Sequence, residues 1–540
     1  MRSLIVILGL SITALAQASE LRERWIYYSS NLAVDKNIDA LESVAIRGTK
    51  AGYNGLVLSD SKFGRLDELN QHYFQNIDRV KKIAAANHLQ VIPCIFPIGY
   101  SESLLAHDPN LAEGLPVHDA LYVVENGRAN LVSDPAVTLP QDGFKDFSKW
   151  QFHDDTVVAA DDGAVKIIKP DGKNARIAQK LTVRPFHQYH ISVMVKTDDF
   201  NGTPKVAVLG KAEHELNYAD LGVKRTQDWT THHVVFNSLD NDQVEIYFGC
   251  WDGKTGTLEW KNPKLEETGL VNLIRRDGAP VEIKLENGKA LSEGKAFDKV
   301  ADSRMGNAPW KGSFEVWHEP PVIHTRLADG TRLSVSYYHA TIIHDDQVMI
   351  CISEPKTLEL LRDQAKRMVA AWGAKGYFMS HDEIRVLNWD KSCQDKHATP
   401  GEILAKNVRT CIGILREVNP GGDIYVWSDM FDPKHNAHKN YYLVNGDLAG
   451  SWRGLDKDVI IVPWNFDERA DALKWFASLG NRMVIAGYYD ANPNDVKQWL
   501  DAARPFNGVI GLMYTTWENN FGDLEKIGRL IEPGQPRTDH

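Results

Sequence analysis

The sequence predicts an α/β protein: a (β/α)8 TIM barrel that an antiparallel β-sandwich domain interrupts after strand three. Three observations support this prediction. Both ends of the 540-residue chain alternate short apolar runs with amphipathic stretches, which is typical of a parallel sheet covered by helices. The middle, from about residue 105 to 345, has no convincing amphipathic helix and instead alternates apolar with polar residues. The strand-like runs of the two ends total eight, the number that closes a barrel.

The first part of the barrel, residues 19–104, contains three of these runs. Each run is short, apolar and followed by polar or turn residues, and helical spacing separates one run from the next. The expected order is strand Arg24–Ser29, helix Asp35–Gly52, strand Gly55–Leu58, helix Tyr73–Asn87 and strand Leu89–Phe96.

The middle of the chain divides into three pieces. Residues 105–140 are expected to be a linker or loop. Residues 141–267 hold short alternating segments parted by turn residues, the pattern of a β-sandwich. These segments are Ala164–Ile168, Ala175–Val183, Tyr189–Thr197, Lys205–Leu209, Thr230–Phe236 and Val244–Trp251. Residues 268–354 carry hairpin-like pieces, with a turn signal at Asp329-Gly330, and are expected to return the chain to the barrel.

The second part of the barrel, residues 355–540, resumes the alternation. Pro400 suits the first turn of a helix, and Asn419-Pro420-Gly421-Gly422 suits its end. The expected helices are Pro355–Trp372, Pro400–Val418, Glu468–Leu479, Asp495–Ala503 and Gly522–Ile531; the expected strands are Gly376–Ile384, Asp423–Met430, Val459–Trp464, Arg482–Tyr489 and Gly508–Trp517. Two separate α/β domains are the alternative, but each would then have to cover its own sheet edges.

Composition is that of a globular protein, and the first residues predict export. Apolar residues make up 43% and charged residues 25%, and the net charge of −11 argues against a nucleic-acid partner. Residues 1–18 read as a signal peptide, with a basic start, an apolar run and a final Ala16-Gln17-Ala18, so we expect a secreted or periplasmic protein. No later stretch reaches the roughly 18 apolar residues of a membrane span. Of the five cysteines, Cys393 and Cys411 are a possible disulfide.

The stretch Lys375–Ile384 carries the strongest chemical signal. Its apolar run ends abruptly in His381-Asp382-Glu383, and catalytic residues of β/α barrels lie at the carboxyl ends of the strands. Two neighbouring carboxylates raise each other's pKa, which can keep one of them protonated as a general acid. Because consecutive strand residues alternate faces, Asp382 and Glu383 can share a pocket only if the strand twists or ends between them. An acidic loop that caps the next helix is the alternative.

Aromatic and polar residues recur at the ends of the other expected strands. Flat apolar rings stack on sugar rings, while carboxylates and amides bind hydroxyl groups, and ligand pockets combine these elements. The candidates are Asp60 after strand two, His381 after strand four, Trp427 and Asp429 after strand five, Trp464 after strand six, Tyr488 and Asp490 after strand seven, and Trp517 and Glu518 after strand eight. We therefore expect an oligosaccharide or polysaccharide as the partner.

Other chemistries find little support in the sequence. The three consecutive residues of His381-Asp382-Glu383 alternate faces and lack the i, i+4 histidines of helical zinc sites, and the cysteines show no metal-ligand spacing. We find no G-x-S-x-G serine motif and no glycine-rich phosphate loop after a strand. The sequence therefore implies neither a metal nor an organic cofactor, and it leaves a structural Ca²⁺ in the sandwich open.

At these residues the two barrel halves resemble the glycoside hydrolase family 20 β-N-acetylhexosaminidases. The Asp-Glu pair that ends strand four is similar to the catalytic pair of that family, Tyr488-Tyr489-Asp490 is similar to its tyrosine-x-aspartate, and Trp517 and Glu518 are similar to its final tryptophan and glutamate. The resemblance implies substrate assistance, an exception to the usual two-carboxylate scheme. Asp382 would orient the acetamide, and Glu383 would act as acid and base.

The remaining roles also come from this resemblance. Tyr488 would contact the acetamide, Asp490 and Glu518 would hold sugar hydroxyls, and Trp427, Trp464 and Trp517 would form the aromatic walls. The family's arginine after strand one and its histidine after strand three have no counterpart, since Ser29-Ser30-Asn31 and Pro97–Tyr100 stand there. The middle domain resembles a carbohydrate-binding module.

Three functions therefore stay open. The first is a secreted, exo-acting hydrolase of β-linked (N-acetyl)hexosamine glycans. The second is a β-glycosidase for a non-acetylated polysaccharide, with Glu383 as acid/base and Glu518 as nucleophile. Retaining enzymes of that kind hold the two carboxyls about 5–5.5 Å apart. The third is a non-catalytic glycan-binding protein, because a barrel alone does not establish catalysis.

Overall fold

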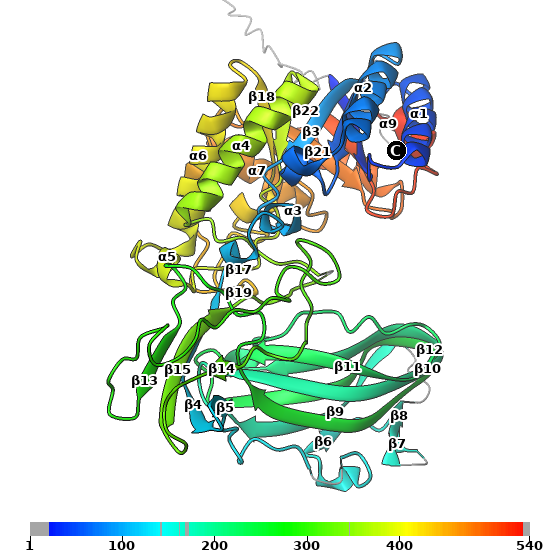
Figure 1. Ribbon diagram of the computed structural model, residues 1–540. Coiled ribbons are helices and arrows are strands. Elements are labelled where there is room, and N and C mark those ends of the chain that lie inside the picture. Colours follow the sequence, from blue (N-terminus) through cyan, green and yellow to red (C-terminus); the bar gives the residue numbers. More distant parts are fainter. Residues whose placement is uncertain (1–20, 141–142, 161–162, 168–171, 345, 533–540) are drawn as a thin grey trace, which may run out of the picture.

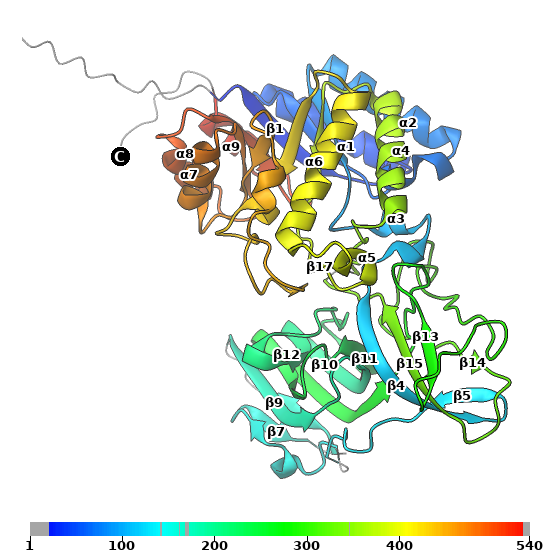
Figure 2. The same ribbon diagram turned by 90° about the vertical axis from the view of Figure 1, so that its left-hand side faces the viewer.

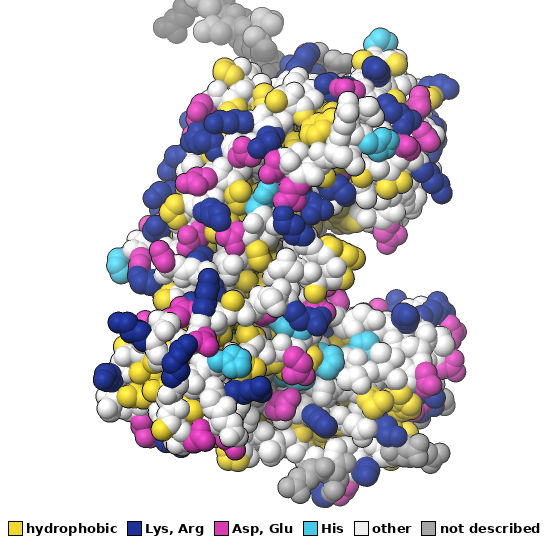
Figure 3. Space-filling model, in the orientation of Figure 1, with side chains coloured by type: hydrophobic (Ala, Val, Ile, Leu, Met, Phe, Trp, Pro, Cys, Tyr) yellow, Lys and Arg dark blue, Asp and Glu magenta, His cyan; other side chains and the backbone are white. Residues whose placement is uncertain are grey.

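The structure is a computed structural model that describes residues 21–140, 143–160, 163–167, 172–344 and 346–532. The signal peptide predicted at residues 1–18 lies outside these ranges. The chain forms two bodies, a helix-covered barrel and a domain of antiparallel sheets (Figure 1), and a second view shows the same separation (Figure 2). On the face shown in Figure 3 an open notch separates the barrel from the edge of the sheet domain.

The barrel is closed, parallel and eight-stranded, as the sequence predicted. Its strands follow one another in the order of the chain, and the last strand pairs with the first. They are β1 (Glu23–Ser29), β2 (Gly55–Ser59), β3 (Gln90–Ile95), β16 (Gly376–Met379), β18 (Asp423–Trp427), β20 (Ile460–Val462), β21 (Met483–Tyr488) and β22 (Val509–Thr515). The alternative of two separate α/β domains is therefore wrong, because β3 pairs with β16 across the inserted domain.

Helices cover the barrel where the periodicity predicted them. They are α1 (Asp35–Lys50), α2 (Gln71–Ala86), α4 (Pro355–Trp372), α6 (Pro400–Val418), α7 (Arg469–Leu479), α8 (Asp495–Ala503) and α9 (Leu524–Leu530). Helix α6 begins at a capping box, in which the Thr399 side chain accepts from the Glu402 amide and the Glu402 carboxylate accepts from the Thr399 amide. One apolar layer packs between strands and helices, and a second fills the barrel interior, where Trp25, Phe378 and Tyr425 pack together.

Residues 105–140 are not a linker, which corrects the sequence prediction. After the short helix α3 (Glu102–Leu105) and a 3-10 turn η2 (Pro109–Leu111), this segment forms β4 (Leu115–Glu125) and β5 (Arg128–Leu131). Both strands belong to a five-stranded sheet with β13 (Glu282–Leu285), β14 (Ile323–His324) and β15 (Arg332–His339). The segment that leaves the barrel thus pairs with the segment that returns to it, and the paired residues lie some 200 positions apart in the sequence.

The β-sandwich is one antiparallel sheet that bends over itself. It contains β6 (Phe152–His153), β7 (Val157–Ala159), β8 (Val165–Ile167), β9 (Lys173–Thr182), β10 (Gln188–Leu209), β11 (Gln227–Asn237) and β12 (Gln243–Thr268). The predicted segments Tyr189–Thr197 and Lys205–Leu209 are two halves of the single strand β10. Register shifts interrupt β10 and β12, and the rings of Phe248 and Trp260, both on β12, lie only 6.0 Å apart. The strand therefore folds back and brings its two halves into one core.

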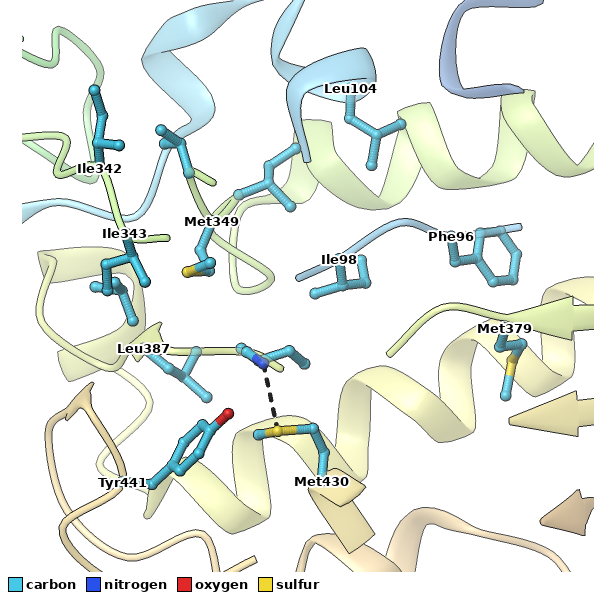
Figure 4. Close-up of a cluster of buried hydrophobic side chains, with 14 of the residues drawn as sticks. Phe96, Ile98, Leu104, Ile342, Ile343, Met349, Met379, Leu387, Met430 and Tyr441 are labelled. Atoms are coloured by element: carbon cyan, nitrogen blue, oxygen red, sulfur yellow. Dashed lines mark hydrogen bonds between the residues drawn. The ribbon is translucent and has the colours of Figure 1, made fainter. Parts of the chain in front are cut away.

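The return from the inserted domain packs against the carboxyl ends of the barrel strands. Ile342, Ile343 and Met349 of the returning segment belong to the same buried cluster as Ile98 and Met430 (Figure 4). In this cluster the Ile384 amide donates to the Met430 sulfur at 3.3 Å. The loop that follows β16 is therefore held from both sides.

Two further findings concern the cysteines and the membrane. Cys411 does not pair with Cys393, which corrects the disulfide suggested by the sequence: the nearest sulfur to Cys393 Sγ is that of Cys351, at 3.7 Å, and all five cysteines are free thiols. Among the described residues, no helix has both the length and the apolar character that crossing a bilayer requires.

Candidate active site

Asp382 and Glu383 both line one cavity at the carboxyl end of the barrel. This is possible because β16 ends at Met379 and Glu383 takes a left-handed backbone conformation, with φ of 49°. The Glu383 amide then donates to Asp429 Oδ2 at 2.8 Å, which fixes that conformation. A backbone held outside its usual region at such a place is typical of a functional site.

Gly99 allows the loop after β3 to approach this turn. A Cβ atom at Gly99 would lie 1.9 Å from the Asp382 carbonyl oxygen, which is backbone and cannot rotate away. The close approach places Tyr100 over Glu383, and the Tyr100 hydroxyl donates to Glu383 Oε2.

We therefore expect Gly99→Ala to push the two loops apart, lower the free energy of unfolding by about 1–3 kcal/mol and reduce any activity at the cavity at least tenfold. Thermal unfolding and steady-state kinetics measure the two effects. Gly413→Ala on α6 is the matched control, because a Cβ atom there meets nothing within 4 Å. Equal behaviour of the two variants would show that the close approach at Gly99 is unimportant.

Glu383 is held by a cation and by the returning segment. Arg385 Nη2 lies 2.7 Å from Glu383 Oε1, and Arg385 Nη1 donates to the Gln347 side-chain oxygen. The Gln347 amide nitrogen donates to the carbonyls of Gly99, at 2.7 Å, and Glu383, at 3.1 Å. Gln347 therefore joins the inserted domain to both loops that carry the candidate site.

The surroundings of Asp382 disfavour a negative charge on its carboxyl group. Burial, then Asp429 and then Glu383 raise the pKa of its carboxyl well above the usual range, and only Arg385 among the nearby side chains acts in the opposite direction. Its Oδ1 atom is buried and has no hydrogen-bond partner within the described chain. Asp382 thus lines the cavity with a carboxyl group that has one buried, unpaired oxygen.

The cavity has a volume of about 700 Å³, in the range of small-molecule pockets. Three tryptophans line it: Trp427 and Trp464 are held among the strand ends, whereas Trp517 is 51% exposed. The ring of Trp517 lies 5.8 Å from that of Trp427 and 6.4 Å from that of Trp464. The walls therefore offer flat apolar faces beside the acids, the combination that stacks on sugar rings.

Asp60 also lines the cavity, but its oxygens are already engaged. They accept hydrogen bonds from the amides of Leu32 and Lys62 and from the Tyr73 hydroxyl, at 2.7–2.9 Å. The Asp60 carboxylate therefore holds the segments that follow β1 and β2, and its oxygens are already hydrogen-bonded without a ligand.

Five of the predicted binding residues do not line this cavity. His381 follows the end of β16, is fully buried and contacts the Asn407 side chain of α6, and burial lowers its pKa to about 4. Asp429 lies behind the acid pair, where it accepts from the Glu383 amide, Trp464 Nε1 and Asn436 Nδ2.

The other three belong to the last two strand ends. Tyr488 turns toward the helix layer, where its hydroxyl donates to Asp523. Asp490 accepts from the amides of Trp517 and Glu518, at 2.7 and 3.1 Å, and so positions the Trp517 loop. The Glu518 side chain is exposed outside the cavity wall.

Several wall residues were not found from the sequence. Tyr100 follows β3 but was not among the predicted site residues, Arg385 lies beyond the end of β16, and His344 comes from the inserted domain. Glu102 on α3 also lines the cavity, and burial raises the pKa of its carboxyl to about 7. These residues come from segments far apart in the sequence, so only the fold brings them together.

Comparisons with known proteins assign no family to the chain. No protein-family model matches it, and no curated protein matches it. Solved structures similar along most of the chain include a glycoside hydrolase family 20 β-N-acetylglucosaminidase, at 9% identity over 94% of this chain and 67% of the other, with a TM-score of 0.37. The N-acetyl-β-hexosaminidase of Streptomyces plicatus matches at 10% identity over 95% and 64%, with a TM-score of 0.38. A rhamnosidase from Novosphingobium sp. PP1Y matches at 10% identity over 95% and 58%, with a TM-score of 0.32.

A further match covers only part of the chain. A CBM4 structure matches at 22% identity over 21% of this chain and 77% of the other, with a TM-score of 0.18. At these identities and TM-scores none of the neighbours carries its activity over to this chain.

Proposed function

We propose that the protein is an exported glycoside hydrolase that removes terminal β-linked (N-acetyl)hexosamine residues by a substrate-assisted, retaining mechanism. The observation that carries the proposal is the cavity itself: two adjacent acids from one strand end, Asp382 and Glu383, stand in a space walled by three tryptophans. The volume of about 700 Å³ is that of a pocket for a small ligand, such as one or a few sugar units.

In the proposed first step, the acetamido oxygen of the bound sugar attacks the anomeric carbon while Glu383 gives a proton to the departing glycosidic oxygen. The C–O bond of the leaving group breaks, and a cyclic oxazolinium cation forms. In the second step, Glu383 takes a proton from water, whose oxygen attacks the same carbon and reopens the ring. The product keeps the β configuration because two displacements occur.

Asp382 has a distinct role in this scheme. Its carboxylate, which lines the cavity, accepts the acetamide N–H and then faces the positive charge that develops in the ring. Burial and the neighbouring acids make its negative charge unfavourable in the free protein, and a cation at this place relieves that cost. The interaction is therefore stronger in the transition state than in the ground state, as catalysis requires.

The two-carboxylate alternative finds less support. It requires an ionised nucleophile opposite Glu383, and Glu518 lies outside the cavity wall. Of the other acids among the described lining residues, Asp60 is fully hydrogen-bonded and Glu102, with a pKa of about 7, is half protonated at neutral pH. A non-catalytic glycan-binding role would not explain why an acid stands where burial and its neighbours disfavour its charge.

A cyclic thiazoline analogue of the oxazolinium tests this mechanism. We expect it to inhibit competitively and to bind at least 10²-fold more tightly than the parent N-acetylhexosamine, because transition-state mimics gain that much. Proton NMR of the first product is expected to show the β anomer. Inversion at the anomeric carbon, or an analogue that binds no better than the sugar, would contradict substrate assistance while leaving hydrolysis possible.

Trp517 is expected to bind the sugar through its ring face. Trp517→Ala should raise KM about tenfold with a smaller effect on kcat, because stacking on a ring stabilises substrate and transition state alike. The exposed Trp310, 70% accessible and outside the cavity, is the matched control. Equal KM values for the two variants would show that the tryptophan wall does not hold the substrate.

A further inference from the structure

A second cluster of reactive side chains lies where the chain leaves and re-enters the barrel. Glu113, Cys351, Asp390 and Cys393 are all buried, and one ligand atom from each lies within 4.8 Å of every other. Glu113 follows η2 on the way out, Cys351 precedes α4 on the way back, and Asp390 and Cys393 belong to the short helix α5 (Lys391–Gln394) and its N-cap. None of the four lines the candidate active site.

The distances within this cluster fit the edges of a tetrahedral zinc site. With Zn–S bonds of 2.3 Å, two sulfur ligands of one tetrahedron lie about 3.8 Å apart, and a sulfur and a carboxylate oxygen about 3.5 Å apart. Cys351 Sγ and Cys393 Sγ are 3.7 Å apart, and Cys393 Sγ and Glu113 Oε2 are 3.4 Å apart. A disulfide would bring the sulfurs to about 2.0 Å. Two of the six edges of a tetrahedron therefore match a shared ion, and without an ion the same two distances are those of thiol hydrogen bonds.

The surroundings already orient the ligands. The amides of Trp389 and Asp390 donate to Glu113 Oε1, which leaves Oε2 directed at Cys393. Arg276 donates to Asp390 Oδ2 at 2.5 Å and to Glu354 Oε1 at 2.6 Å. Hydrogen bonds that hold ligands from outside are a regular feature of metal sites.

The charge of the cluster also calls for a cation. In the described parts of the chain, no lysine, arginine or histidine forms a salt bridge with Glu113, and the residue is 2% exposed. Buried carboxylates are almost always paired or bound to a metal. With both thiols ionised, a divalent ion and Arg276 would offset three of the four negative charges.

We propose that Glu113, Cys351, Asp390 and Cys393 bind one structural Zn²⁺ ion. Thiolates together with carboxylates suit zinc, and a closed set of four protein ligands is typical of a structural site. The ion would join three segments far apart in sequence: the outgoing chain, the returning chain and the loop after β16. The Glu113 amide donates to the Met349 carbonyl and the Cys351 amide to the Leu111 carbonyl, so the two crossing segments are already paired at this point. The inference does not depend on the proposed glycosidase activity.

The first test uses the full mature protein as purified, without added metal. Elemental analysis after exhaustive dialysis is expected to give about one zinc per chain. The protein is then denatured with a chelator present and with oxygen and reducing agents excluded. A thiol assay should count all five cysteines as free thiols. Three thiols and no metal would show a Cys351–Cys393 disulfide instead, and five thiols without metal would show an ordinary buried cluster; both results would overturn the proposal.

Variants localise the ion. Cys351→Ser, Cys393→Ser and Glu113→Gln are expected to lose the zinc and to unfold at lower temperature. Cys411→Ser should keep it, and it is a matched control because Cys411, like Cys351 and Cys393, is a fully buried free thiol. Replacement of zinc by Co²⁺ should give the charge-transfer absorption of thiolate ligands. Zinc retained in both cysteine variants, or lost from the control, would place the ion elsewhere.

Discussion

Glu383→Gln is expected to lower kcat/KM for aryl β-N-acetylglucosaminides by about 10²–10⁴-fold while the fold is retained. The glutamine keeps the size of the side chain and can still meet Tyr100 and Arg385, but it cannot give a proton to the leaving oxygen. Steady-state kinetics on the purified variant, with circular dichroism to check the fold, measure the effect.

The leaving group provides an internal check on this prediction. An aryl group that departs readily needs no protonation, so the first step should recover in Glu383→Gln for such a substrate, whereas a poor leaving group should show the full loss. Glu518→Gln is the matched control, because the exposed Glu518 carboxylate lies outside the cavity wall. If Glu518→Gln were as inactive as Glu383→Gln, the two-carboxylate mechanism would replace substrate assistance.

Asp382→Asn is expected to lower kcat by about 10²–10³-fold and, at the same time, to stabilise the fold at neutral pH. The raised pKa of Asp382 means that the folded protein binds a proton more tightly than the unfolded chain, so wild-type stability falls as pH rises above the ordinary value of 3.8. The decline ends once pH passes the raised folded pKa. Asparagine removes this cost, since it carries no charge at any pH.

Thermal unfolding of the two proteins across pH measures the effect. The unfolding temperature of Asp382→Asn should exceed that of wild type by about 2–4 °C at pH 8, and the difference should shrink toward pH 4. Asp429→Asn is a useful comparison, because Asp429 accepts three hydrogen bonds and its loss should destabilise the protein. A wild type that is more stable than Asp382→Asn at pH 8 would show that the Asp382 charge is well compensated.

The barrel was predictable because its signals are local. Periodicity and turn residues mark each strand and helix, and α6 and α8 begin and end at the predicted residues. The prediction failed where pairing is non-local: β4 contacts β15 across more than 200 residues, and its short neighbours have no separate signature. The two halves of β10 were likewise read as two strands, because register shifts interrupt the alternation.

The candidate site was predictable in its acids and tryptophans and not in its supporting residues. Asp382, Glu383, Trp427, Trp464 and Trp517 follow from the rule that barrel chemistry lies at strand ends. The sequence does not show that His381, just after the end of β16, turns away from the cavity to Asn407. Arg385 and Gln347 were missed because their placement depends on a turn at Glu383 and on the returning segment.

The measurement that tests the central claim most directly is hydrolysis of four aryl β-glycosides by wild type and Glu383→Gln. The substrates are the N-acetylglucosaminide, the N-acetylgalactosaminide, the glucoside and the galactoside. We expect wild-type turnover only of the two N-acetyl sugars and its loss in the variant. Equal turnover of the plain glycosides would contradict substrate assistance through Asp382. Turnover unchanged in Glu383→Gln would contradict the assignment of this cavity as the active site.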